Sequence, residues 1–323
     1  MIAHFFVFSL GLVGLYFGAE WLVRGAARWA RTRGVSAVAV GLTIVAFGTS
    51  APELVVSTVA AARAQVGVAL GTVIGSNILN VGLILGVASL IRPLRVQMRL
   101  VAGEVPLLLA VSVAVPLLSL DGALGRVDAA FLLGGFAGYL GFVLRMARRA
   151  PDLAEATYLE FEAAESLEPR GETWGRDLLV ITAGLGALAL GAHAAVTGAV
   201  GVASLFGVSD LVIGLTVVAI GTSLPELATS VTAAIRGEAD IAVGNIVGSN
   251  LFNLLAILGA AAAVRPLEVP GALLRFEIPV MIGLSLLLWP IVWTRLRVER
   301  WEGGLLLAGY VAFQVWLIVR ALA

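Results

Sequence analysis

The chain has 323 residues, of which 60% are hydrophobic and only 13% are charged. A soluble domain carries about 25% charged residues, so this composition indicates an integral membrane protein whose surroundings are the lipid bilayer. Zero net charge without a basic patch argues against nucleic acid binding, and the absence of cysteine with only two histidines excludes disulfides, iron–sulfur clusters and a histidine-based metal site.

We predict ten membrane spans, because about 20 apolar residues cross the hydrocarbon core of a bilayer as a helix. The first stretch has no basic leader, which favours a membrane span over a signal peptide. Most of the connections are short and contain arginine, glycine, proline or aspartate. The predicted spans are residues 5–27, 36–62, 67–91, 101–120, 127–146, 178–200, 211–235, 241–264, 273–293 and 303–322.

The exception among the connections is residues 147–177, which hold 8 of the 21 acidic residues. We expect a solvated acidic linker here; a regulatory calcium site is the alternative, although the stretch lacks the alternating acid and glycine pattern of an EF-hand loop. The linker divides the chain into two five-helix halves, residues 1–146 and residues 178–323.

The arginine distribution predicts how the chain is oriented, because cytoplasmic loops carry an excess of basic residues. If the N-terminus lies outside, 16 of the 21 arginines fall on the inner side of the membrane and 5 on the outer side. We therefore expect a multi-pass protein of the cell (plasma) membrane with both termini outside and the linker 147–177 in the cytoplasm.

The second half of the chain repeats the first at a shift of 173 residues without a gap. The matched positions include Gly18 and Gly191, Thr49 and Thr222, Ser50 and Ser223, Pro52 and Pro225, Glu53 and Glu226, Ser76 and Ser249, and Asn77 and Asn250. Each copy contains five predicted spans, an odd number, so the second copy enters the membrane from the opposite face. The predicted fold is an all-α polytopic membrane protein built from two inverted-topology repeats, an arrangement that places ion sites near the membrane midplane.

The first repeated element reads GLTIVAFGTSAPEL at 41–54 and GLTVVAIGTSLPEL at 214–227. Pro52 has no N–H, so the carbonyl of Gly48 loses its helical partner. In lipid, an unpaired carbonyl is tolerated only where protein, water or an ion satisfies it.

The same element places two hydroxyls beside a carboxylate. Thr49 and Ser50 lie four and three residues before Glu53, which puts all of them on one helix face. These groups are oxygen ligands of the kind that hard cations prefer. The second copy supplies Thr222, Ser223 and Glu226.

The second repeated element reads GTVIGSNILN at 71–80 and GNIVGSNLFN at 244–253. Ser76 and Asn80 share a helix face, as do Ser249 and Asn253, because each pair is four residues apart. Glycines at small-xxx-small spacing allow these helices to approach their neighbours closely, so short side chains can reach across.

Glu53 and Glu226 decide between a cation site and a structural role for these elements. A helix kink or polar packing contacts would explain either element alone. A carboxylate at the bilayer centre, however, costs about 2.5–3.5 kcal/mol on insertion scales and is by default functional. No lysine occurs in the chain, and no arginine lies within ten residues before either glutamate. Two such acids at equivalent positions predict a shared site whose charge matches one Ca²⁺.

Glu20 and His193, another matched pair, are interpreted as side chains that snorkel to the membrane interface.

The G-T-S-x-P-E and G-S-N-x-x-N elements resemble the two alpha-repeats of the calcium:cation antiporter superfamily, most closely its prokaryotic sodium/calcium exchanger branch. The resemblance covers both halves but not the linker. It implies ten helices around a diamond of cation positions at the membrane centre, with spans 1 and 6 as a long tilted pair that slides across the rest. It also implies that Glu53 and Glu226 hold Ca²⁺, helped by carbonyls near Thr49 and Thr222.

The resemblance further implies where Na⁺ binds. One sodium position would lie around Ala46, Thr49, Ser50, Glu53 and Ser249. A second would lie around Ala219, Thr222, Ser223, Glu226 and Ser76. Asn80 and Asn253 would line the middle position. Several sodium/calcium exchangers have aspartate where this chain has Asn253, so a dependence on H⁺ or K⁺ is left open.

The predicted function is therefore a secondary active antiporter that exchanges Na⁺ for Ca²⁺ by alternating access. A proton/calcium exchanger, or another cation exchanger that uses the same two glutamates, is the alternative. An intramembrane enzyme would need a nucleophile–base pair or a set of metal-ligating histidines, and a passive channel would not need broken helices in inverted repeats. We expect no enzyme activity, no cofactor besides the transported ions, and a monomer without a protein partner.

Overall fold

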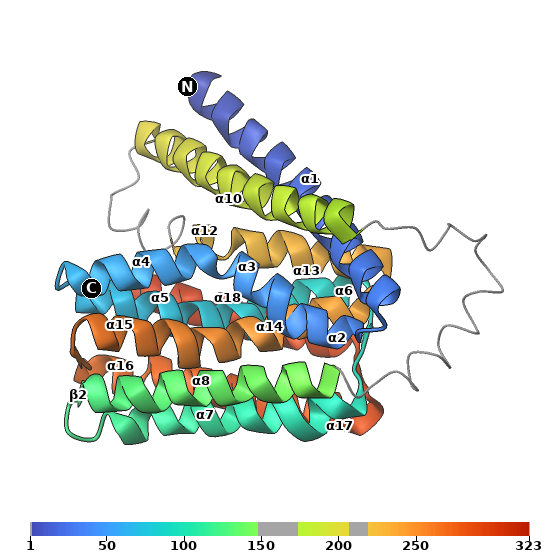
Figure 1. The fold of residues 1–323 in the computed structure, drawn as a ribbon. Coiled ribbons are helices and arrows are strands. Elements are labelled where there is room, and N and C mark those ends of the chain that lie inside the picture. The colour runs from blue at the N-terminus through green and yellow to red at the C-terminus, as the bar shows by residue number, and fades with distance from the viewer. Residues whose placement is uncertain (1, 148–173, 207–218, 323) are drawn as a thin grey trace.

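A computed structural model of the chain describes residues 2–147, 174–206 and 219–322, and nearly all of these residues are helical (Figure 1). Within these ranges eight helices are long and apolar enough to cross a membrane, or nine if one bent pair counts as a single span. Most of the predicted linker and the start of the seventh predicted span, 211–218, lie outside the described residues.

The helices of the first half follow the predicted spans. They are α1 (Ile2–Arg33), α2 (Ala37–Val40), α3 (Ala46–Thr49), α4 (Ala51–Ala62), α5 (Val66–Leu79), α6 (Leu85–Ile91), α7 (Val105–Leu118) and α8 (Arg126–Ala147). Three π-helical turns interrupt or extend them, namely η1 (Gly41–Val45), η2 (Asn80–Ile84) and η3 (Leu100–Glu104).

The second half reproduces most of these elements. Its helices are α10 (Trp174–Leu205), α12 (Ala219–Gly221), α13 (Leu224–Arg236), α14 (Ala239–Phe252), α15 (Leu258–Val264), α16 (Gly271–Arg275), α17 (Glu277–Arg295) and α18 (Arg300–Leu322), and its π-helical turn is η5 (Asn253–Ile257). The bounds of α5, η2 and α6 recur 173 residues later in α14, η5 and α15. The sequence repeat is thus also a repeat of secondary structure.

The predicted helix break lies at Pro52. Helix α3 ends at Thr49 and α4 begins at Ala51, with a bend of 48° between Ala37–Thr49 and Ala51–Ala62. Proline lies in the first turn of α4, where its missing N–H breaks no helical hydrogen bond. The gap between α12 and α13 has the same cause, because Pro225 occupies the equivalent place.

Two π-helical turns begin at Asn80 and Asn253, which the sequence alone did not indicate. A π-helical turn inserts one extra residue into the helix and is frequent at functional sites. Here it starts at the asparagine that closes each G-S-N-x-x-N element, at equivalent positions in both halves.

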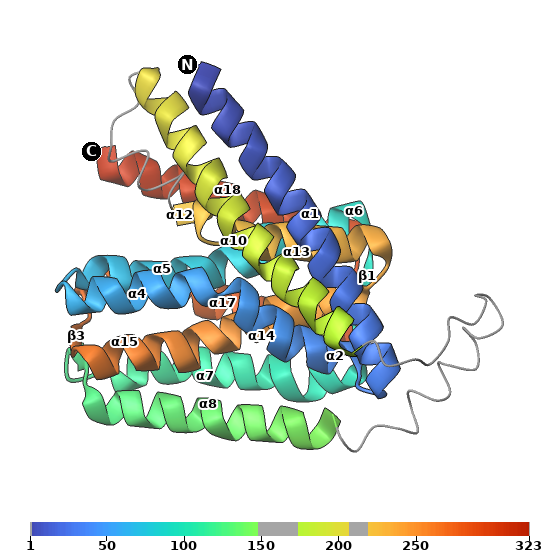
Figure 2. The same cartoon turned by 45° about the horizontal axis from the view of Figure 1, so that its top comes forward.

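Helices α1 and α10 lie side by side and oblique to the remaining helices, as both views show (Figures 1 and 2). They run antiparallel, since Gly11 faces Ala195 while Gly25 faces Ile181. Their backbones touch: a Cβ on Gly18 would lie 2.6 Å from the backbone nitrogen of Leu188. Each helix has 32 residues and extends beyond the predicted spans 5–27 and 178–200 at both ends.

Among the described residues, four two-residue strands depart from the all-α expectation. The strand β1 (Leu94–Arg95) pairs antiparallel with β4 (Arg297–Val298), and β2 (Ala123–Leu124) pairs antiparallel with β3 (Leu267–Glu268). Prolines at 93 and 266 explain where β1 and β3 start, because a residue before proline is held in an extended conformation that ends the preceding helix. The ladders join connections of the first half to connections of the second.

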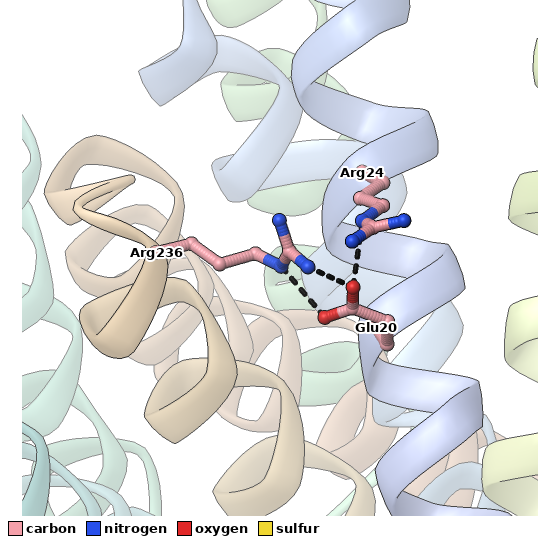
Figure 3. A network of polar contacts seen from close by, with 3 residues as sticks. All are labelled: Glu20, Arg24 and Arg236. Carbon is pink, nitrogen blue, oxygen red and sulfur yellow. Dashed lines mark hydrogen bonds and ion pairs between the residues drawn. The ribbon is translucent and has the colours of Figure 1, made fainter.

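A three-residue ionic network ties α1 to α13 (Figure 3). Nε of Arg236 donates to Oε2 of Glu20 at 2.6 Å, and Nη2 of Arg236 contacts Oε1. Nε of Arg24 lies 2.6 Å from the same Oε1. The Glu20 side chain is only 13% exposed, whereas its partners Arg236 and Arg24 are 31% and 63% exposed. Two guanidinium groups therefore neutralise its carboxylate, and its position relative to the membrane interface stays a prediction.

We expect Glu20→Ala to lower the thermal unfolding midpoint of the detergent-purified protein. The reason is that Arg236 would lose a charged acceptor, and hydrogen bonds to charged groups contribute about 1.5–3 kcal/mol each. Glu299→Ala is the matched control, because Glu299 pairs with a more exposed arginine, Arg297. Charge reversal in Glu20→Arg combined with Arg236→Glu should recover part of the loss, and equal midpoints for the two alanine variants would contradict this role.

Candidate cation site

The two predicted glutamates occupy equivalent places at the two helix breaks. Glu53 lies in the first turn of α4, and Glu226 lies in the first turn of α13. Their relative exposures are 0% and 2%, so both carboxyl groups are buried. The first turn of a helix carries a partial positive charge from its unpaired N–H groups, which favours a carboxylate there.

Hydroxyls from each half bind the carboxylate of the other half. Oγ of Ser50 donates to Oε1 of Glu226 at 2.8 Å, and Oγ of Ser223 donates to Oε1 of Glu53 at 2.9 Å. Oγ of Ser76 lies 3.0 Å from Oγ of Ser223. These crossed contacts bring the two breaks together, although Ser50 and Ser223 are 173 residues apart in the chain.

Four asparagines form a second crossed set beside the breaks. Nδ2 of Asn80 donates to Oδ1 of Asn250 at 2.9 Å, and Nδ2 of Asn253 donates to Oδ1 of Asn77 at 3.3 Å. Each of the two predicted site residues, Asn80 and Asn253, thus uses its amide nitrogen to reach the other half. Asn77 and Asn250 were not among the predicted ligands, although their place in both G-S-N elements was a signal that could have identified them.

Five of the eleven buried side-chain oxygens without a hydrogen-bond partner in the described residues belong to the predicted site. A buried acceptor without a partner costs about 1–3 kcal/mol, more if it is charged, so a bound cation would stabilise such a set. The predicted-site atoms in this group are Oε2 of Glu53, Oε2 of Glu226, Oδ1 of Asn80, Oδ1 of Asn253 and Oγ of Ser249. Carboxylate, amide and hydroxyl oxygens are the ligands that Ca²⁺ accepts, so the donor set fits a hard cation.

Neither glutamate has a basic partner in the described part of the chain. Within the described parts of the chain, salt bridges join arginines to Glu20, Asp177, Glu238, Glu104 and Glu299, and none involves Glu53 or Glu226. The same residues contain no group of three or more acidic or histidine side chains that could hold a metal. The candidate site therefore has two carboxylates, and its remaining oxygens are neutral.

The other predicted ligands surround these groups. Ala46 and Thr49 are the first and last residues of α3, and the carbonyl of Ala46 accepts the N–H of Ser50 at 3.1 Å. Ala219 begins α12, and Thr222 lies in the gap between α12 and α13. The side chain of Thr222 also interacts with the carboxylate of Glu53.

The fold and the site define a polytopic helical membrane protein with buried, oxygen-lined helix breaks in its interior. The chain belongs to the sodium/calcium exchanger protein family, whose sequence profile matches residues 3–145 and again residues 177–319. The two matches coincide with the two halves of the chain.

Several similar proteins cover nearly the whole chain. CaxA of Alkalimonas amylolytica is 39% identical over 320 residues, which are 98% of this chain and 99% of CaxA. The inner membrane protein YrbG of Escherichia coli is 37% identical and covers 95% of this chain and 94% of its own length. The sodium/calcium exchanger MaX1 of Methanosarcina acetivorans is 33% identical, with coverages of 97% and 98%.

Solved structures of the sodium–calcium exchanger NCX_Mj have the same fold. The structure obtained with 10 mM Na⁺ and 10 mM Sr²⁺ is 32% identical, covers 96% of this chain and 97% of its own, and superposes with a TM-score of 0.82. The structure soaked without Na⁺ and Ca²⁺ is 31% identical, with coverages of 98% and 99% and a TM-score of 0.83.

Proposed function

We propose that this protein is a secondary active antiporter that exchanges Na⁺ for Ca²⁺ by alternating access, with its ion site between Glu53 and Glu226. The observation that carries the proposal is the pair of buried carboxylates, each bound by a hydroxyl from the opposite half and each with one unpaired oxygen. The names of MaX1 and NCX_Mj, which state sodium/calcium exchange, support the choice of ions.

We also propose that the halves 1–146 and 178–323 are inverted-topology repeats of five spans each, joined by the acidic linker 147–177. The antiparallel course of α1 and α10, which open the two halves, supports this arrangement. The β ladders agree with the predicted topology, because each joins two connections that we expect on the same side of the membrane. The arginine bias favours both termini outside.

The chemistry follows from charge balance. A doubly charged empty site in a low-dielectric interior is costly, so the site is stable when a cation compensates it. One Ca²⁺ compensates both carboxylates, and Na⁺ ions can do so in its place at the hydroxyl and amide oxygens. Because both ions need Glu53 and Glu226, they compete for the site. Exchange results when the site, loaded with either ion, changes the side of the membrane from which it is accessible. A sodium gradient then drives calcium in the opposite direction.

The test is ⁴⁵Ca²⁺ uptake into proteoliposomes under separately imposed gradients. We expect uptake when the vesicles are loaded with Na⁺ and diluted into Na⁺-free medium, because outward Na⁺ movement is coupled to inward Ca²⁺ movement. Uptake driven only by a pH gradient would support the proton/calcium alternative instead. Uptake without any coupling ion would indicate a channel and overturn the antiporter proposal.

A further inference from the structure

Asn245 on α14 connects three elements around the site. Its residue is fully buried, with a relative exposure of 0%. Its Oδ1 accepts a hydrogen bond from Oγ1 of Thr49 at 3.2 Å, and its Nδ2 donates to Oγ of Ser230 at 3.0 Å. Thr49 ends α3 and Ser230 lies on α13 one turn after Glu226, so Asn245 links the break of the first half to the helices of the second.

The bond to Asn245 is the shorter of two that the Thr49 hydroxyl can donate, because the carbonyl oxygen of Ala46 lies at 3.4 Å; the same side chain also interacts with the carboxylate of Glu226. A threonine hydroxyl has one proton and two lone pairs. When the proton is donated to Asn245, both lone pairs stay available; the hydroxyl of the neighbouring Ser50 is bound to Glu226. An oxygen with free lone pairs can bind a cation, whereas one that points its proton at the ion cannot.

Thr222 interacts with the carboxylate of Glu53 as Thr49 does with that of Glu226, but the described residues of the first half supply it no amide like that of Asn245. The position that matches Asn245 is Thr72, whose hydroxyl donates to the carbonyl of Val68 on its own helix at 2.8 Å. The position that matches Ser230 is Ser57, whose hydroxyl donates to the carbonyl of Ala69 at 3.4 Å. The two halves therefore differ at this contact, because the second half has the amide of Asn245 where the first half has the hydroxyl of Thr72.

We propose that Asn245 is a positioning residue that turns the Thr49 hydroxyl into a cation ligand and makes the two sodium positions unequal. The inference rests on the proposed function. Na⁺ should be more sensitive to this contact than Ca²⁺, because Ca²⁺ is held mainly by two full negative charges. A sodium position depends more on neutral oxygens that are correctly oriented.

The first test is Asn245→Thr, which introduces into the second half the residue type found at the matching position of the first half, Thr72. We measure ⁴⁵Ca²⁺ uptake while varying the Na⁺ inside the vesicles, and separately while varying Ca²⁺ outside. The expected result is a rise of about fivefold in the Na⁺ concentration for half-maximal uptake, which corresponds to the loss of one neutral hydrogen bond. The Ca²⁺ concentration for half-maximal uptake should change little. A general structural defect would shift both or lower only the maximal rate.

The chain supplies a matched pair of milder variants in case Asn245→Thr does not fold. Ser230→Ala removes the second anchor of the Asn245 amide and should raise the half-maximal Na⁺ concentration in the same direction. Ser57→Ala, at the matching position of the first half, should leave it unchanged. Thr49→Val tests whether Asn245 acts through Thr49, because residues that share one interaction have non-additive effects. Adding Asn245→Thr to Thr49→Val should then produce no further shift.

Each contrary result has a definite meaning. Unshifted sodium dependence in Asn245→Thr or Ser230→Ala, or additive effects with Thr49→Val, would overturn the role of Asn245 while the unaltered protein still exchanges Na⁺ for Ca²⁺. If the unaltered protein shows no sodium-driven ⁴⁵Ca²⁺ uptake, the proposed function and this inference are both overturned.

Discussion

Replacing either buried glutamate by glutamine is expected to abolish sodium-driven ⁴⁵Ca²⁺ uptake. Glu53→Gln and Glu226→Gln keep the shape of the side chain but remove one of the two charges that compensate Ca²⁺. The two variants should be equally inactive, because each carboxylate has the same place in its half and the same kind of serine partner. Glu268→Gln on the exposed end of β3 is the control and should transport normally.

The thermal unfolding midpoint distinguishes a variant that has lost an ion ligand from one that has lost its fold. Both carboxylates are buried and have no basic partner among the residues that the structure describes, so their neutral replacements should unfold at the same temperature or a higher one. The expected combination is therefore no transport and no loss of the thermal midpoint in detergent without Ca²⁺. Added Ca²⁺ should raise the midpoint of the unaltered protein, because a ligand that binds only the folded state stabilises it, and should not raise that of the variants. Normal uptake by either variant would remove the glutamates from the site.

The helix break of the candidate site could be predicted from the sequence, because the covalent chemistry of proline determines the local structure. Pro52 cannot donate a hydrogen bond, so a break at this place follows from the residue itself, and the structure shows it. The burial of Glu53 and Glu226 follows similarly from their position within long apolar stretches. The repeat then predicted which positions of the second half would match them.

The contacts between the halves could not be predicted in this way. The sequence repeat shows that Asn80 and Asn253 are equivalent, but not that each bonds to an asparagine of the other half. The π-helical turns that start at these asparagines have no strong residue signature, because they depend on how neighbouring helices pack. The ion pair between Glu20 and Arg236 likewise joins residues 216 positions apart, where periodicity carries no information.

Gly191 lies where the backbones of α1 and α10 are in close contact. We expect Gly191→Ala to lower both the thermal midpoint and the rate of ⁴⁵Ca²⁺ uptake. A Cβ at Gly191 would lie 2.6 Å from the backbone nitrogen of Leu15 and 2.9 Å from the carbonyl oxygen of Gly11, so the helices would have to separate. Overpacking of this kind costs about 1–3 kcal/mol, and backbone atoms cannot move aside as a side chain can.

Gly186→Ala on the same helix isolates this effect from the helical preference of alanine. Apart from the backbone of its own helix, no atom of the described residues lies within 4 Å of a Cβ at Gly186, so the substitution creates no contact with another element among them. Alanine favours a helix over glycine by about 0.8–1 kcal/mol, which means that Gly186→Ala should be neutral or slightly stabilising. The same preference acts in Gly191→Ala, so any net destabilisation there must come from the α1–α10 contact and is a lower bound on its cost. If the two variants had equal midpoints and equal uptake, close backbone packing would not be what holds α1 against α10.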